Sequence, residues 1–223
     1  MINAKDSKNT FYILNKKENT PIILIHGVGL NHKIWEPQIN SFDNTVLVYD
    51  ILGHGNTPLT KSQISFDDFS LQLLNLIDEL KFEKIHLVGF SIGSLIVRNF
   101  ASKYNNRLES LTLLCSVFQR SKEQQQIVND RLELSKKSKS LSKQALKRWF
   151  TDDYINKNPN LYEKICSMLE ENNMENFLKV YELFVKHQDN EIVIAIGGAS
   201  SGRAHARTGD RYQDMKEMGI EPK

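Results

Sequence analysis

Apolar and polar residues alternate along the first half of the chain in blocks typical of strands with helices between them. Short runs that are apolar on both faces, rather than alternating with polar residues, predict strands buried on both faces. They occur at 21–27, 45–50, 84–90 and 110–116, with a weaker run at 11–17. The weaker run predicts a strand at the sheet margin. Ser65 and Asp68 form a capping-box pattern at the start of a helical spacing. This order predicts an α/β fold with a mostly parallel sheet flanked by helices.

From about Ser121 to His187 the apolar residues follow helical spacing only. Examples are Leu141, Ala145, Leu146 and Trp149, then Tyr162, Ile165 and Leu169, then Phe177, Val180, Tyr181 and Phe184. This pattern predicts an all-helical insert, which either completes the covering of the sheet or forms a lid over a site. We therefore divide the chain into a core at 1–120 and a helical cap at 121–189.

The segment 190–223 differs from the rest in composition. Asparagine is frequent up to Asn190 and absent after it, whereas alanine and arginine crowd into "AIGGASSGRAHARTGDRYQD". We interpret this tail as frameshifted or chimeric rather than as a natural, divergent C-terminus. The final strands of the core would then be absent, and the strand at 110–116 would form an exposed sheet edge prone to aggregation.

Composition narrows the possible partners. The 223 residues are 40% hydrophobic and 25% charged, with a net charge of +2, so no strong field for nucleic acid or an acidic membrane is expected. No apolar run approaches the roughly 18 residues of a membrane span, and no secretory signal is visible, so we expect a cytoplasmic protein. Cys115 and Cys166 lie outside any C-x-x-C spacing, which argues against a disulfide framework or a zinc site. The sequence does not indicate an oligomeric state.

The stretch "IHLVGFSIGSLIV" carries the clearest chemical signal. A G-x-S-x-G pattern follows a predicted buried strand and opens a predicted helix, a context that places Ser91 on a sharp, strained turn with its hydroxyl exposed. Side chains at Gly89 and Gly93 would collide with the neighbouring strand and helix. The helix N-terminus would also favour developing negative charge. The alternative is an ordinary strand–turn–helix junction in which Ser91 is the N-cap.

A second loop, in "LIHGVGLNHKIW", follows the first buried strand. Acyl transfer requires two backbone N–H donors facing an oxyanion. Ile92, directly after the serine, is one candidate, and Val28, after Gly27, is the other. We interpret His26 as a residue that shapes this loop and Trp35 as a packing residue.

The other histidines are interpreted as structural. Asp50 and His54 in "YDILGHGNTP" fit a tight turn better than a catalytic pair. We expect His86 to be a hydrogen-bonded histidine in the core or at its boundary, and His32 and His187 to be surface residues.

Together the H-G loop, the D-x-x-G-H-G turn and the G-x-S-x-G elbow resemble the α/β-hydrolase superfamily over about residues 11–190. "HGVGLNHKIW" and "ALKRWFTDDY" are similar to the 3-oxoadipate enol-lactonase and pimeloyl-carrier-protein esterase group. Ser91 argues against haloalkane dehalogenases, which place an aspartate at the elbow. The resemblance implies that Ser91 attacks a small carboxylic ester or lactone to form an acyl-enzyme, that Val28 and Ile92 form the oxyanion hole, and that no metal or organic cofactor takes part.

The superfamily order is Ser, then Asp or Glu, then His, and no such acid and base are identifiable here. His205 precedes Asp210 and Asp214, and Asp189 with His205 lacks a convincing intervening strand. We therefore expect impaired hydrolysis. The alternatives are a non-catalytic protein of the same fold that binds a small molecule, and a carbon–carbon bond hydrolase that uses the same serine.

Overall fold

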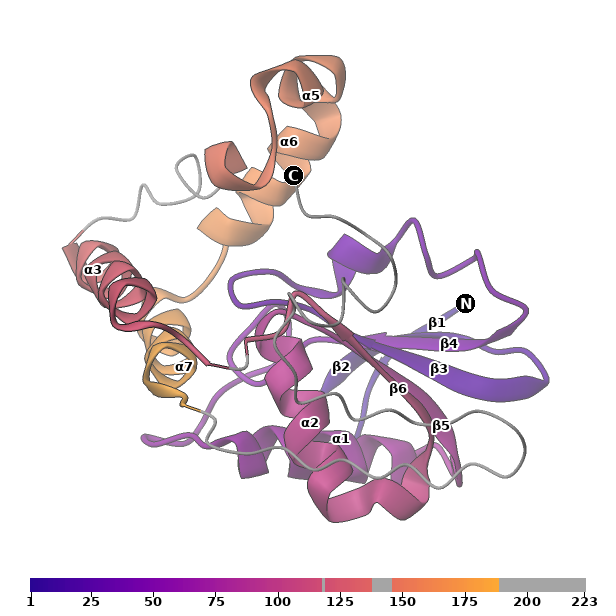
Figure 1. Cartoon of the computed structure of the whole chain (residues 1–223). Coiled ribbons are helices and arrows are strands. Elements are labelled where there is room, and N and C mark those ends of the chain that lie inside the picture. Colours follow the sequence, from indigo (N-terminus) through magenta and orange to yellow (C-terminus); the bar gives the residue numbers. More distant parts are fainter. Residues whose placement is uncertain (118, 138–145, 189–223) are drawn as a thin grey trace, which may run out of the picture.

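The computed structural model describes residues 1–117, 119–137 and 146–188, and its strands form one six-stranded sheet (Figure 1). The strand order is β1-β2-β4-β3-β5-β6. The strands are β1 (Ile2–Lys5), β2 (Phe11–Asn15), β3 (Asn19–Ile25), β4 (Asn44–Tyr49), β5 (Ile85–Phe90) and β6 (Leu108–Leu114). Strands β4, β3, β5 and β6 are parallel, whereas β1 and β2 are antiparallel to their neighbours. The predicted α/β fold with a mostly parallel sheet is confirmed.

The N-terminal margin of the sheet differs from the expectation. The predicted marginal strand, β2, lies one place inside, because β1 pairs with it in antiparallel register, with Ile2 opposite Leu14. The polar N-terminus gave no strand signal. An edge strand that is mostly exposed needs few apolar residues.

Helices α1 (Phe66–Glu79) and α2 (Ile92–Tyr104) pack together on one face of the sheet (Figure 1). Their fully buried Phe69 and Phe100 join the main core with Ile23 and Leu47 of the central strands. The predicted capping box is present, since the Ser65 N–H donates to the Asp68 carboxylate over 2.8 Å.

The opposite face is covered by the short helix η1 (His32–Trp35) and the residues after it. Trp35 and Ile39 pack against Ile22 of β3 and Val46 of β4, which confirms Trp35 as a packing residue. Over β5 the same face is less protected, because Val88 remains half-buried.

Strand β6 forms the other margin of the sheet. Among the described strands its one neighbour is β5, and its last two residues, Leu113 and Leu114, are 40% and 38% exposed. Among the described residues, this edge combines backbone groups that no further strand pairs with and exposed apolar side chains, which is the arrangement that favours aggregation.

A charge on this edge is expected to keep the protein in solution. Leu113→Lys places a solvated ammonium at a position that is already exposed, so we expect little loss of folding stability and slower aggregation on concentration. Light scattering against protein concentration measures this. Equal aggregation of the variant and the parent protein would mean that another surface is responsible.

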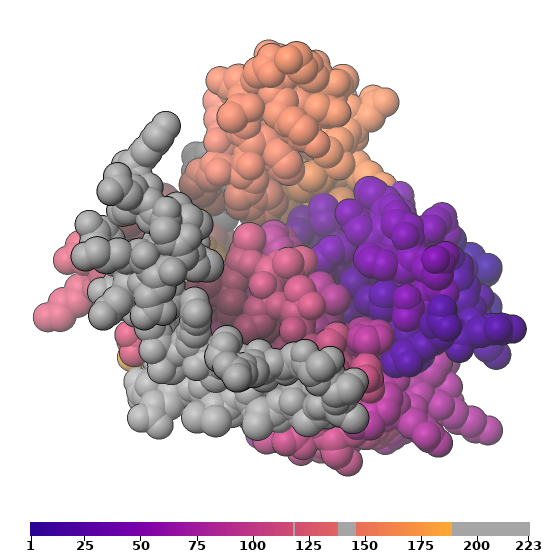
Figure 2. All heavy atoms as spheres, turned by 45° about the vertical axis from the view of Figure 1, so that its right-hand side comes forward, coloured from indigo at the N-terminus to yellow at the C-terminus, as the bar shows by residue number. Residues whose placement is uncertain are grey.

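The described residues beyond Ser121 form helices joined by short connections. They contain α3 (Lys122–Lys137), a helical turn at 146–149, α5 (Asp152–Lys157), α6 (Pro159–Glu170) and α7 (Met174–Lys186). In Figure 2 the orange residues, which belong to α5 and α6, form a lobe that protrudes from the core. Within the described ranges, no helix has the length and apolar character to cross a membrane.

Arg120 ties the beginning of this insert to its end. Its guanidinium donates hydrogen bonds to the carbonyls of Phe184, Val185 and His187, at 3.1, 3.2 and 2.9 Å. It also lies 4.8 Å from the ring centre of Phe184. The last carbonyls of a helix lack partners inside the helix, so one arginine both caps α7 and fixes where the insert meets the core. The predicted tail at 190–223 lies outside the described residues.

Candidate active site

Ser91 lies between β5 and α2 with φ 56° and ψ −117°. A conventional N-cap serine has extended backbone angles and accepts a hydrogen bond from the first helical turn. Ser91 has neither feature, since its side chain makes no capping bond. Its N–H instead donates to the Leu114 carbonyl of β6 over 2.9 Å. A non-glycine residue with these angles is strained, and the surrounding sheet must hold it there.

The two elbow glycines lie where a side chain cannot fit. A Cβ on Gly89 would lie 2.5 Å from the Gly93 carbonyl carbon and 2.7 Å from the Ser94 nitrogen. A Cβ on Gly93 would lie 2.7 Å from the Ile25 carbonyl oxygen. The close approach of helix α2 to β3 and β5 therefore depends on both glycines, as the sequence predicted.

The H-G loop lies directly beside Ser91. Strands β3 and β5 are parallel neighbours, with Ile25 opposite Gly89, so their carboxyl ends meet at one edge of the sheet. A Cβ on Gly27 would lie 3.3 Å from the Cβ of Ser91 and 3.1 Å from the Phe90 ring. The fold thus brings together two segments more than sixty residues apart in the sequence.

Two backbone amides belong to the segments that meet at Ser91, those of Val28 and Ile92. Residues 27–30 form a turn closed by the Leu30 N–H on the Gly27 carbonyl at 3.2 Å, with φ +78° at Gly29. A positive φ at this position is typical of a type II turn. Ile92 is the first residue of α2, where N–H groups have no partner inside the helix. Among the described residues, neither the Val28 nor the Ile92 N–H has a hydrogen-bond acceptor.

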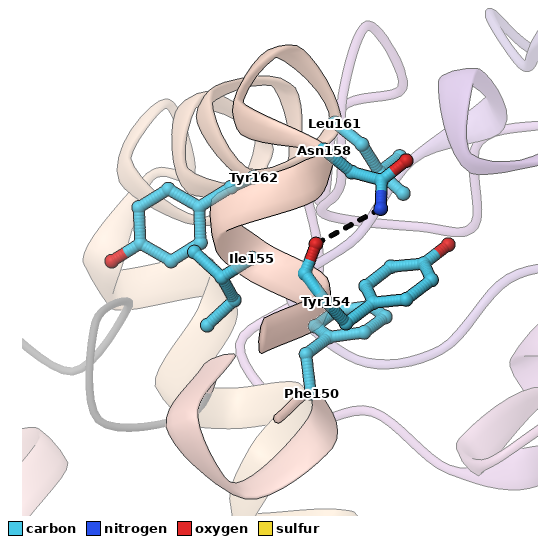
Figure 3. A pocket seen from close by; sticks show the side chains of 6 residues that line it. All are labelled: Phe150, Tyr154, Ile155, Asn158, Leu161 and Tyr162. Carbon is cyan, nitrogen blue, oxygen red and sulfur yellow. Dashed lines mark hydrogen bonds between the residues drawn. The ribbon is translucent and has the colours of Figure 1, made fainter. Parts of the chain in front are cut away.

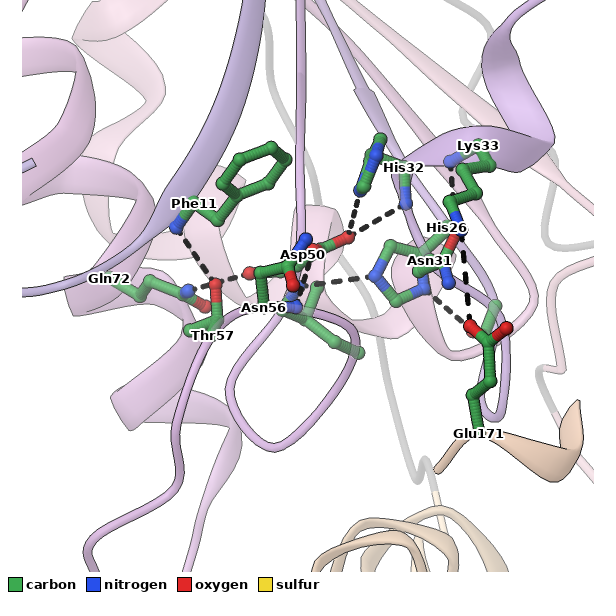
Figure 4. Close-up of polar contacts among 12 residues, drawn as sticks. Phe11, His26, Asn31, His32, Lys33, Asp50, Asn56, Thr57, Gln72 and Glu171 are labelled. Atoms are coloured by element: carbon green, nitrogen blue, oxygen red, sulfur yellow. Dashed lines mark hydrogen bonds and ion pairs between the residues drawn. The ribbon is translucent and has the colours of Figure 1, made fainter. Parts of the chain in front are cut away.

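His26 and His54 are buried, with 0% and 1% exposure, and both bind backbone (Figure 4 shows His26). His26 donates from Nδ1 to the Gly27 carbonyl at 2.8 Å and accepts at Nε2 from the Ile51 N–H at 3.1 Å. His54 accepts at Nε2 from the Gly29 N–H at 2.9 Å, and its Nδ1 lies 3.3 Å from the Leu52 carbonyl. The interpretation of both residues as structural is confirmed by these contacts.

Burial also sets the charge of these two rings. It lowers the pKa of His54 to about 3, with a further contribution from the neighbouring His26. Burial likewise lowers the pKa of His26, although the negative charge of Asp50 acts to raise it. Both rings are therefore neutral at pH 7, which suits acceptors of backbone hydrogen bonds.

Asp50 organises the tight turn at 50–57, and its contact with His32 corrects one prediction. His32, expected at the surface, is only 6% exposed and donates to Asp50 Oδ1 from both its backbone N–H and its Nδ1, each at 2.8 Å (Figure 4). The Asn56 N–H donates to the other oxygen over 2.8 Å. Burial by itself would raise the pKa of Asp50, but the His32 hydrogen bond and the nearby charges lower it overall. A Cβ on Gly55 would overlap this carboxylate, which explains the glycine in the tight turn.

The remaining histidines are less involved. His86 is half-buried on β5 with Nδ1 2.8 Å from the Ser110 hydroxyl, which confirms the prediction. His187, expected at the surface, is half-buried against the Phe66 ring, with ring centres 4.9 Å apart. The tail candidates Asp189, His205, Asp210 and Asp214 lie outside the described residues.

The cap contains a small cleft of its own, lined by Phe150, Tyr154, Ile155, Asn158, Leu161 and Tyr162 (Figure 3). Its empty volume of about 160 Å³, open solvent included, is below the range of small-molecule sites. None of its lining residues belongs to the elbow or the H-G loop. Within the described part of the chain, no group of three or more His, Cys, Asp or Glu could hold a metal ion.

Sequence reasoning missed the contacts between the cap and the two loops. The side-chain amide of Asn172, between α6 and α7, donates to the Gly29 carbonyl over 2.7 Å. Lys33 pairs with Glu171 at 3.9 Å on the surface (Figure 4). The polar stretch at 171–173 is a recognisable turn between two helical patterns, but nothing local indicates what it contacts.

The comparisons with known proteins agree with this geometry. Residues 20–145 match the family described as alpha/beta hydrolase fold. The (E)-2-((N-methylformamido)methylene)succinate hydrolase of Acinetobacter baylyi is 28% identical over 182 residues, which cover 81% of this chain and 68% of that protein. The 3-oxoadipate enol-lactonase 1 of the same organism is 24% identical over 199 residues, covering 88% and 74%. The crystal structure of the enol-lactonase from Burkholderia xenovorans LB400 has the same fold, with a TM-score of 0.70 at 22% identity over 79% of this chain and 71% of that one.

Proposed function

Because the chain belongs to the alpha/beta hydrolase fold family, we propose that it is a serine hydrolase of small carboxylic esters or lactones. One observation carries the proposal: the strained Ser91 lies beside a loop and a helix N-terminus whose Val28 and Ile92 amides have no acceptor among the described residues. Strained residues cluster at active sites. Two free amides beside a serine hydroxyl can stabilise an oxyanion.

In the proposed reaction the Ser91 oxygen attacks the carbonyl carbon of the substrate while its proton passes to a base. The negative charge that develops on the carbonyl oxygen is stabilised by the Val28 and Ile92 amides. The bond to the alcohol oxygen then breaks, the alcohol takes a proton, and an acyl-enzyme remains. Water attacks the acyl group and releases the acid, which restores the serine.

Among the described residues, the histidines beside these loops are already engaged and do not supply the base. His26 and His54 use both ring nitrogens for backbone contacts, and His32 is bonded to Asp50. Loss of the histidine from such a triad can lower turnover by about 10⁶-fold. We therefore propose that turnover by this chain is slow, while attack by Ser91 on a highly reactive probe is still measurable.

The relatives suggest where to look for a substrate, since their names include a succinate hydrolase and an enol-lactonase. The cap also carries positive charge near Tyr181: burial raises the pKa of its hydroxyl, and the guanidinium groups of Arg131, Arg148 and Arg120 oppose that change. A substrate panel should therefore include esters and enol-lactones with and without a carboxylate. Dienones in the same panel test the carbon–carbon hydrolase alternative.

A fluorophosphonate probe tests the proposal on the full chain. We expect covalent labelling on the peptide that contains Ser91, and complete loss of labelling in Ser91→Ala. The control is Ser102→Ala, which removes an exposed hydroxyl from the same helix and should be labelled like the parent. An unlabelled parent protein would overturn the proposal in favour of a non-catalytic protein that binds a small molecule.

A further inference from the structure

The turn at residues 27–30 has its peptide groups held from three directions. The Gly27 carbonyl accepts from His26 Nδ1 and from the Leu30 N–H. The Gly29 N–H donates to His54 Nε2, and the Gly29 carbonyl accepts from Asn172. The core supplies the restraints on the Gly27 carbonyl and on the Gly29 N–H, and the cap supplies the third restraint, on the Gly29 carbonyl.

These restraints decide where the Val28 N–H points. It belongs to the same planar peptide unit as the Gly27 carbonyl, and the two groups of a trans peptide point in opposite directions. Since the carbonyl faces the His26 ring and Leu30, the Val28 N–H is turned away from them. Any rotation of the turn that moved the Val28 N–H would have to break hydrogen bonds at Gly27 or Gly29.

Asn172 has the chemistry required for the third restraint. Its side-chain NH₂ has two hydrogens, and it lies 2.7 Å from both the Gly29 carbonyl of the core and the Met168 carbonyl at the end of α6. The Asn172 side chain thus binds both the C-terminal end of α6 and the turn at 27–30. A carboxylate in its place could donate to neither carbonyl.

Apolar contacts hold the cap at the same point. A Cβ on Gly29 would lie 2.9 Å from Leu169 Cδ2 and 3.2 Å from the Phe177 ring. Glycine is thus needed at position 29 both for its positive φ and for the close approach of α6 and α7.

We propose that Asn172 is a positioning residue for the oxyanion hole, which couples the placement of the cap to the orientation of the Val28 amide. This inference rests on the proposed function of Ser91. It predicts that loss of the hydrogen bond from Asn172 to the Gly29 carbonyl slows the reaction of Ser91. Without Asn172, the turn keeps its hydrogen bonds to the core and its apolar contacts with Leu169 and Phe177, but it loses its hydrogen bond from the cap.

The first test is independent of catalysis. Amide hydrogen exchange of the ¹⁵N-labelled full chain is measured for the parent, Asn172→Asp, Asn172→Ala and the control Asn158→Ala. The Asn158 amide donates to the Tyr154 carbonyl inside the cap. We expect the Gly29 amide to exchange roughly 2- to 10-fold faster in both Asn172 variants, the range for loss of one hydrogen bond, and at the parent rate in the control. Unchanged exchange at Gly29 in folded Asn172 variants would overturn the proposal.

The second test measures the rate of Ser91 labelling by the fluorophosphonate probe. We expect both Asn172 variants to be labelled roughly 2- to 10-fold more slowly than the parent, and the Asn158 control to be labelled at the parent rate. Asn172→Asp keeps the size of the side chain, so a parent-like rate in that variant would mean that packing alone matters and would overturn the proposal. If the parent itself is not labelled, the proposed function fails, and the exchange rates still decide whether Asn172 holds the turn.

Discussion

Gly89→Ala is expected to destabilise the folded state severely. The added methyl would overlap the backbone of Gly93 and Ser94, not the end of a flexible side chain. Relief requires that α2 move away from the sheet, where its buried Ile92, Ile96 and Phe100 pack. We expect a loss of about 4 kcal/mol or more in the free energy of unfolding. That is a large part of the stability of an ordinary domain, which is about 5–15 kcal/mol.

Gly27→Ala is the matched control. It adds the same methyl group in the same region, but the nearest atoms belong to the Phe90 ring at 3.1 Å, and the φ of Gly27 is not positive. A small shift of that ring relieves the contact, so we expect a cost of about 1 kcal/mol. Urea unfolding followed by tryptophan fluorescence compares the two. Similar stabilities of both variants would show that the elbow tolerates a side chain at position 89.

The features that the sequence predicted are those with a local signal. The central strands are buried on both faces, so the middle of each run, 22–25 and 46–48, is apolar at successive positions. The elbow is recognisable because a strand, three fixed residues and a helix occur within one short segment. The tight turn at 50–57 was also predictable, because its glycines carry positive φ angles that other residues rarely adopt.

The features that the sequence did not predict depend on partners far away along the chain. His32 looks like a surface residue in "LNHKIW", yet it is buried because Asp50, eighteen positions later, accepts both of its donors. Strand β1 forms because β2 offers it an edge, not because its own residues are apolar. Asn172 contacts Gly29 across 143 positions. Such pairs are set by the tertiary fold, so no period or motif within one segment identifies them.

The protein is expected to lose stability steeply in mild acid, because it buries two neutral histidines. In the unfolded chain a histidine has a pKa of about 6.5, whereas burial lowers the pKa of His54 to about 3 and also lowers that of His26. Below pH 6.5 the unfolded state therefore binds protons that the folded state does not. Stability is complete above about pH 6.5 and falls as the pH decreases toward about 3, and His54 alone costs about 2 kcal/mol at pH 5.

Asp50 adds to this loss at lower pH. Its pKa is lowered in the folded protein, so its contribution is present above the unfolded pKa of about 3.9 and disappears as the pH falls through the folded value. The two histidines thus act first and the carboxylate later. The rings and the carboxylate hold the two loops beside Ser91, so their protonation acts on the contacts that hold the turn that carries Val28.

His54→Gln separates this mechanism from general acid denaturation. Glutamine can still offer an oxygen to the Gly29 N–H but takes up no proton. Unfolding of the variant should therefore be coupled to the uptake of one proton fewer than unfolding of the parent. We expect the slope of the unfolding free energy between pH 6 and 4 to fall by about 1.4 kcal/mol per pH unit relative to the parent. Urea unfolding at several pH values measures the slope. If the parent and the variant have the same slope, His54 takes up its proton over the same pH range in the folded and the unfolded protein, and burial does not lower its pKa.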